Sequence, residues 1–254
     1  MTSARRDTGG PGCQRGAILM RTRLVAISFL AALVPAAAET SLPYAIETFG
    51  AFRKVILEGD FTPKVSLGAV MPKNPTVGVG AVADARGEIT IHDGKLIVSY
   101  GKAGPHPAAE SEPAGLLATA KVAGWQTIKV EQDVAPDDIE KFIARTAAAH
   151  GVNQEGPFPY QIRGTLASYV MHVNAEPTNG PHGMGQPIAV TMEIKGNTIA
   201  GSVSGIYASQ DLVGIVSHGG TRTHSHWVSP DGKSTAHLDS WGLKAGAELS
   251  LPKP

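Results

Sequence analysis

Three histidines near the C-terminal end of this sequence have a spacing that could hold one metal ion. His224 and His226 alternate along a predicted strand, so their side chains point to the same face. If Asp231-Gly232 forms a two-residue hairpin turn, His237 lies directly across from His226. Directly opposed Cβ atoms are about 4.5–5.5 Å apart, which allows three imidazoles to converge on one ion.

Three histidine ligands without cysteine are typical of a catalytic metal, because they leave coordination positions open for water or substrate. Zinc is the expected ion, although imidazole also binds copper, nickel, cobalt and iron. The alternative is three unrelated histidines on one hairpin. His218 precedes Gly219-Gly220 and is expected in a loop.

Two charged residues flank this cluster. If the strand begins early, Arg222 shares the face of His224 and His226. Its guanidinium would be repelled by a metal dication there unless an anion lay between the two positive charges. That arrangement suits a substrate carboxylate held between metal and guanidinium. Asp239 would face His224 and could orient its imidazole. The alternatives are an exposed arginine at a loop edge and a solvated aspartate.

The elements that must position these residues are strands for the most part. Within the C-terminal half, residues 151–254, the stretch from Tyr160 to Leu251 lacks a helical period, and its strands are separated by turn signals. These signals are Asn179-Gly180, Gly196-Asn197 and Asp231-Gly232. The pattern predicts an antiparallel, barrel-like C-terminal half that carries the metal site.

The N-terminal half, residues 39–150, mixes helices and strands. Apolar residues at helical spacing predict a helix over 44–57, and a second helix is expected over 136–150. Residues 88–100 contain two strand-like runs around Asp93-Gly94, a strong hairpin signal. The fold class is therefore α+β with two main helices.

Residues 1–38 are expected to be a leader outside the fold. Met20 is the expected start, Arg21 and Arg23 give a positive region, and residues 24–34 are apolar. This is the pattern of a secretory signal peptide cut before Glu39, and its apolar run is too short to span a membrane. A periplasmic or secreted protein with no membrane attachment after processing is expected.

Composition excludes some functions. The chain has 22 Lys+Arg against 22 Asp+Glu, so no basic field exists to bind nucleic acid or an anionic membrane. The single cysteine, Cys13, excludes an internal disulfide framework. Serine hydrolase chemistry has no support because no Gly-x-Ser-x-Gly motif occurs.

Four stretches of the sequence resemble the α-acetolactate decarboxylase family. They are Leu57–Leu96, Pro157–Val170, Gly201–Gly220 and the His-x-His element with its distant third histidine. The resemblance implies a two-part fold rich in antiparallel sheet, a zinc site and a homodimer. It also implies conversion of a 2-hydroxy-3-keto acid, acetolactate, to acetoin and carbon dioxide.

The family's functional positions transfer only in part. Its zinc ligands fall on the three hairpin histidines, and its glutamate near the metal falls on Glu88, the expected proton donor. The family's arginine position is His172 here, so Arg222 or His172 would hold the departing carboxylate. The family's C-terminal glutamate has no counterpart before Pro254.

These departures keep other functions open. One is a metal-dependent lyase or hydrolase for another small keto or hydroxy acid. Another is a non-catalytic exported protein that binds metal or ligand. A cupin fits less well, since its first motif needs a glutamate soon after His-x-His, and residues 227–234 contain none.

Overall fold

The computed structural model describes residues 43–102, 106–175 and 191–254. The predicted leader, its cleavage site and the predicted Asn179-Gly180 turn lie outside these residues. Residues Ser41–Pro254 form one compact unit. No helix in the described ranges is both long and apolar enough to cross a membrane.

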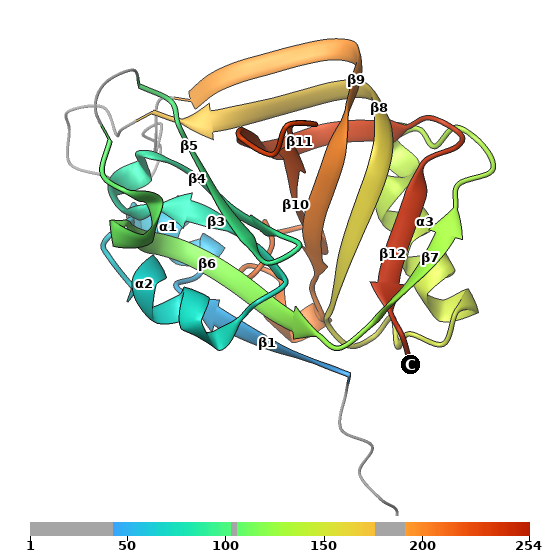
Figure 1. The fold of residues 1–254 in the computed structure, drawn as a ribbon, viewed down its shortest axis with the longest axis horizontal. Helices are drawn as coiled ribbons and strands as arrows, with labels where there is room; N and C mark the ends of the chain where they lie inside the picture. The colour runs from blue at the N-terminus through green and yellow to red at the C-terminus, as the bar shows by residue number, and fades with distance from the viewer. Residues whose placement is uncertain (1–42, 103–105, 176–190) are drawn as a thin grey trace, which may run out of the picture. The chain divides into compact units, whose positions relative to one another are not determined.

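The fold is α+β and consists mainly of two antiparallel sheets (Figure 1). The first sheet has the order β1-β6-β3-β4-β5, and β2 pairs with β6. Its strands are β1 (Tyr44–Phe49), β2 (Val65–Ser66), β3 (Val77–Val82), β4 (Gly87–His92), β5 (Lys95–Tyr100) and β6 (Pro113–Val122).

The second sheet has the order β11-β10-β9-β8-β12-β7. Its strands are β7 (Trp125–Lys129), β8 (Phe158–Asn174), β9 (Thr191–Tyr207), β10 (Thr223–Val228), β11 (Thr235–Leu243) and β12 (Glu248–Pro252). Because β11 pairs with β8 as well as with β10, strands β8 to β11 close into a ring. The chain changes sheet between Val122 and Trp125, earlier than the predicted boundary at 150.

Helices are short and lie between strands. The α-helices are α1 (Phe52–Glu58), α2 (Leu67–Val70) and α3 (Ile139–Ala149). The 3₁₀ segments are η1 (Met71–Lys73), η2 (Ala83–Ala85), η3 (Ala109–Ser111), η4 (Pro136–Asp138) and η5 (Gln210–Leu212). The predicted helix over 136–150 corresponds to η4 and α3, which ends at Ala149, and Gly151 just beyond it has a positive φ of 79°.

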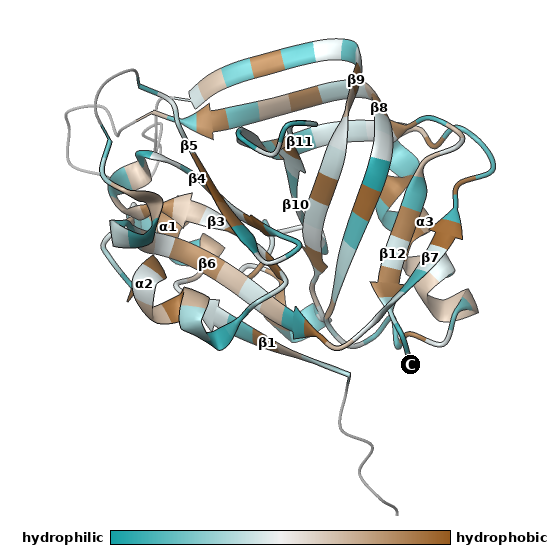
Figure 2. Cartoon of the chain, viewed as in Figure 1, coloured by the Kyte–Doolittle hydropathy of each residue, from teal (hydrophilic) through white to brown (hydrophobic). Residues whose placement is uncertain are grey.

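Apolar side chains join the two sheets. Val77 and Val79 of β3 are fully buried and pack in one cluster with Ile206 at the end of β9. A larger cluster fills the second sheet, where α3 contributes Ile143. Hydrophobic and hydrophilic residues alternate along much of β8 and β9 (Figure 2), whereas residues 158–162 and 203–207 are buried on both faces. The packed sheets hold β4 against β10 and β11, where the predicted site residues lie.

The predicted hairpin at 88–100 is confirmed. β4 and β5 pair antiparallel, with His92 opposite Lys95. The two residues between them have positive φ, 49° at Asp93 and 76° at Gly94, as a type I′ turn requires. This hairpin places Glu88 in the interior strand β4.

Two predicted elements are wrong. Residues 44–57 form strand β1 and helix α1 instead of one helix, because Tyr44–Phe49 pairs with β6. Gly50 separates them with φ of 78°, and a Cβ there would lie 2.5 Å from the carbonyl oxygen of Gly115. The predicted Gly196-Asn197 turn lies inside β9. Gly196 makes room for a ring, since a Cβ there would lie 2.6 Å from the hydroxyl of Tyr169.

Candidate metal centre

The β10–β11 hairpin brings His226 and His237 opposite each other, as predicted. The loop between the strands is wider than the predicted two-residue turn, because Ser229 N–H donates to the carbonyl of Ser234. Both loop lengths are even, so the register and the facing of the side chains are unchanged. His224 lies two residues before His226 on the same face of β10.

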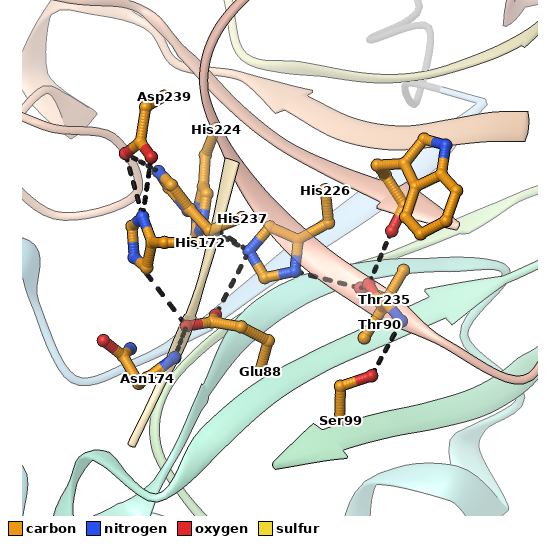
Figure 3. Close-up of polar contacts among 11 residues, drawn as sticks. Glu88, Thr90, Ser99, His172, Asn174, His224, His226, Thr235, His237 and Asp239 are labelled. Atoms are coloured by element: carbon orange, nitrogen blue, oxygen red, sulfur yellow. Dashed lines mark hydrogen bonds and ion pairs between the residues drawn. The ribbon is translucent and has the colours of Figure 1, made fainter. Parts of the chain in front are cut away.

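The three imidazoles converge (Figure 3). His224 Nε2 lies 3.1 Å from His226 Nε2, and His237 Nδ1 lies 3.4 Å from the same atom. Metal–nitrogen bonds of about 2.0–2.1 Å at tetrahedral angles place ligand nitrogens about 3.3 Å apart. Both distances to His226 match this spacing, and the three ligand nitrogens all lie within 4.8 Å of one another, so the cluster could hold one ion.

The charge state of the rings also fits a metal. All three side chains are buried, with exposed fractions of 2%, 0% and 6% for His224, His226 and His237. Burial lowers the pKa of each ring well below 6.5, and the neighbouring histidines lower it further. The rings are therefore neutral near pH 7, which is the form that binds a metal.

A cavity of about 390 Å³ opens beside this cluster. One part of its wall is polar and includes Glu88, His172 and two of the three clustered histidines. The other part is apolar, with Phe52, Val55 and Leu116 among its residues. His226 lies behind this wall and is fully buried. The cavity can take a small molecule with one polar and one apolar side.

Glu88 lies next to the histidines at the cavity wall. Its Oε2 is 3.7 Å from His226 Nε2, and its Oε1 is 3.9 Å from His172 Nε2. The backbone N–H of Asn174 donates to Oε1 at 3.2 Å. Burial raises the pKa of Glu88 to about 8, although the charge of His172 and the bond from Asn174 oppose the shift. This carboxyl is therefore largely protonated at neutral pH.

His172 joins this group from β8, where it lies opposite His237. Its Nδ1 contacts the Asp239 carboxylate at 2.8 Å. Burial would lower the pKa of His172, but the bond to Asp239 and the charges of Glu88 and Asp239 raise it overall. His172 is therefore the group in the polar wall with the strongest tendency to carry positive charge.

The sequence predicted that Asp239 faces His224. In the structure Asp239 instead contacts His172 and orients its ring. A register shift between Leu238 and Ser240 displaces Asp239 from the regular β11 pairing. Beyond His237, β11 leaves β10 and pairs with β8. The pairing of β10 with β11 that the hairpin sets therefore does not predict the neighbours of residues beyond His237.

The sequence profile of the family described as alpha-acetolactate decarboxylase matches residues 29–251. The chain belongs to the α-acetolactate decarboxylase family. No curated protein shows a significant sequence match.

Solved structures of α-acetolactate decarboxylases share the fold. The enzyme from Bacillus subtilis strain 168 is 14% identical and has a TM-score of 0.66, over 82% of this chain and 86% of that one. Acetolactate decarboxylase from Bacillus subtilis subspecies spizizenii gives the same values. A Staphylococcus aureus protein of unknown function, similar to α-acetolactate decarboxylase, is 13% identical with a TM-score of 0.60, over 81% and 84% of the two chains.

In this member of the α-acetolactate decarboxylase family, Arg222 is not among the described residues that line the cavity. Its Nε donates to the carbonyl of Ala208 at 2.7 Å, and its Nη2 donates to the carbonyl of Gln154 at 2.9 Å. The guanidinium also lies over the ring of Tyr207, 4.5 Å from its centroid. Because β10 begins only at Thr223, the predicted alternation does not extend back to Arg222.

Several residues of the site were missed by the sequence analysis. His218 lies in a loop, as expected, but this loop reaches the cavity, and its ring is 4.1 Å from that of Phe52. Thr90 on β4 contacts His226 Nδ1 at 2.9 Å. The only signal in the sequence that could have placed His218 at the site was its position six residues before His224. No local pattern pointed to Thr90, which lies 136 positions from its partner.

Proposed function

We propose that this protein is a zinc-dependent decarboxylase that converts 2-acetolactate to acetoin and carbon dioxide. The observation that carries the proposal is the buried carboxyl of Glu88 beside three convergent histidines in one small cavity. Membership of the α-acetolactate decarboxylase family supports the same reaction class.

The reaction needs an electron acceptor and a proton donor. Loss of carbon dioxide breaks a carbon–carbon bond, and its electron pair passes to the adjacent ketone. The carbon that lost carbon dioxide must then receive a proton to give acetoin. His224, His226 and His237 would hold a divalent metal, which would supply a Lewis acid for the developing negative charge.

Glu88 is suited to supply the proton. Its carboxyl lines the cavity, and burial raises its pKa to about 8 in the metal-free protein, a shift that a bound dication would reduce. A donor with a pKa close to the working pH transfers its proton most effectively. The carboxyl proton passes to carbon, and a proton from the solvent restores it after the product leaves, so each turnover of the acetolactate anion consumes one proton.

His172 is suited to hold the substrate carboxylate. Lys and Arg are both absent from the described residues that line the cavity, so a protonated imidazole is the remaining cationic donor there. The Asp239 carboxylate bonds His172 Nδ1, which leaves Nε2 directed toward Glu88 and the cavity. Charge-assisted hydrogen bonds of this kind fix carboxylates firmly.

A second candidate is a decarboxylase or related lyase for a different 2-hydroxy-3-keto acid. The specific observation in its favour is that the described residues lining the cavity include His172 but no Lys or Arg, whereas the family resemblance implies an arginine at the carboxylate contact. A panel of 2-hydroxy-3-keto acids with different side chains distinguishes the two candidates, since each predicts a different substrate with the highest kcat/KM.

The decisive experiment incubates the purified protein with racemic acetolactate, with and without zinc, and measures acetoin. The proposal predicts acetoin formation that depends on added zinc and stops with a chelator. Inactivity of folded, zinc-loaded protein toward acetolactate, together with activity toward another acid in the panel, would replace the first candidate by the second.

A further inference from the structure

A line of buried hydrogen bonds starts at His226 and ends at a backbone carbonyl. His226 Nδ1 contacts the hydroxyl of Thr90 at 2.9 Å, and this hydroxyl contacts that of Thr235 (Figure 3). The Thr235 hydroxyl donates to the carbonyl of Trp227 at 2.8 Å. His226 and Thr90 are fully buried, and Thr235 is 2% exposed.

The direction of every bond in this line follows from counting protons. A carbonyl oxygen only accepts, so the single proton of Thr235 points to Trp227. The Thr235 oxygen must then accept the proton of Thr90. Because the Thr90 proton is used there, the Thr90 oxygen must accept from His226, whose Nδ1 therefore carries hydrogen.

We infer that Thr90 and Thr235 are positioning residues that fix the tautomer of His226, with the proton on Nδ1 and the lone pair on Nε2. The inference rests on the proposed metal site. Nε2 is the atom that faces His224 Nε2 at 3.1 Å and His237 Nδ1 at 3.4 Å. In this tautomer the lone pair already points to the position of the ion, and no proton has to leave Nε2 when the metal binds.

The contact also joins the two sheets. Thr90 belongs to β4 of the first sheet, whereas His226 and Thr235 belong to β10 and β11 of the second. The backbone N–H of Thr235 donates to the hydroxyl of Ser99 on β5 at 2.8 Å, which holds the same crossing point. The tautomer therefore depends on the packing of one sheet against the other.

Two substitutions should affect the position of the proton on the His226 ring differently. Thr90→Val removes the threonine acceptor, so the preference of His226 for the Nδ1–H form weakens and only the backbone hydrogen bond with Ile89 remains to set it. Thr235→Val leaves Thr90 without its acceptor, and the freed Thr90 hydroxyl turns to donate to Nδ1. The proton of His226 then moves to Nε2, the position where it blocks the metal.

The experiment measures the tautomer of His226 in the metal-free protein by long-range ¹⁵N–¹H correlation NMR, and zinc affinity by competition with a chelating dye. We expect the Nδ1–H form in the wild type and in Thr90→Ser, which keeps the hydroxyl. We expect zinc affinity to fall about 10- to 100-fold in Thr90→Val, the usual effect of removing a partner of a ligating histidine. Thr235→Val should lose at least as much.

Thr119→Val is the matched control. Thr119 is a strand threonine on β6 that is 3% exposed, so the same isosteric change occurs in a buried strand outside the metal centre. This variant should keep both the tautomer and the wild-type zinc affinity. Far-UV circular dichroism of all variants establishes that the fold is retained.

Two results would overturn the inference. An Nε2–H tautomer in the wild type would do so without any variant. Unchanged tautomer and zinc affinity in both valine variants would show that the threonines do not set the tautomer and would leave the backbone hydrogen bond with Ile89 as its cause. If the wild type binds no zinc, the proposed function fails, but the NMR result on metal-free protein still decides the role of the threonines.

Discussion

Replacement of Glu88 by glutamine tests whether this buried carboxyl is protonated at neutral pH. The carboxyl is 2% exposed, and its pKa is raised from 4.5 to about 8. Between these values the folded protein binds a proton that the unfolded chain does not. The contribution of Glu88 to the free energy of unfolding of the metal-free protein should therefore be greatest below pH 4.5. It should fall as the pH rises toward 8.

The magnitude follows from the linkage relation. One proton held only by the folded state gives a slope of about 1.4 kcal/mol per pH unit. From pH 5.0 to 7.5 the wild type should lose about 3 kcal/mol relative to Glu88→Gln, which has no proton to lose. The other titrating groups are common to both proteins, so the difference between the two curves reports Glu88 together with its coupling to His172.

Urea unfolding of chelator-treated wild type and Glu88→Gln at several pH values measures this difference. In zinc-loaded protein, Glu88→Gln should retain the metal and lose about 10²- to 10⁴-fold in kcat, the usual contribution of a general acid. Parallel stability curves for the two proteins would refute the buried protonated carboxyl. An unchanged kcat would refute its role as proton donor.

Further predictions concern the ligands, the carboxylate contact and the leader. His226→Ala and His237→Ala should each lose stoichiometric zinc by elemental analysis, and zinc retained in both would remove the site assignment. His172→Gln should raise KM about tenfold or more, because a charge-assisted hydrogen bond is lost, whereas Arg222→Ala should leave KM unchanged and lower the unfolding temperature. Equal KM effects would contradict this division of roles. N-terminal sequencing of exported protein should begin at Glu39, and a chain that keeps its leader would contradict cleavage there.

Local signals predicted the parts of the site that one hairpin determines. The facing of His226 and His237 depends only on strand alternation and an even loop length, so it survived an error in the loop type. The hairpin around Asp93-Gly94 was equally local. These short-range rules were sufficient to identify the candidate metal ligands.

Long-range pairing decided what the sequence could not show. Residues 44–49 have helical spacing but form β1, because β6 offers a strand edge to them. The bulge in β11 moved Asp239 from His224 to His172, and Arg222 turned to backbone carbonyls of a distant loop. Such contacts depend on tertiary packing, which a single-sequence pattern does not encode.

The central claim is that one divalent metal is bound by three histidines. Crystals of zinc-loaded protein, with anomalous diffraction recorded on both sides of the zinc absorption edge, test it most directly. We expect one strong anomalous peak per chain, about 2.0–2.1 Å from a ring nitrogen of each of His224, His226 and His237. A peak bound elsewhere, or none in fully loaded crystals, would contradict it.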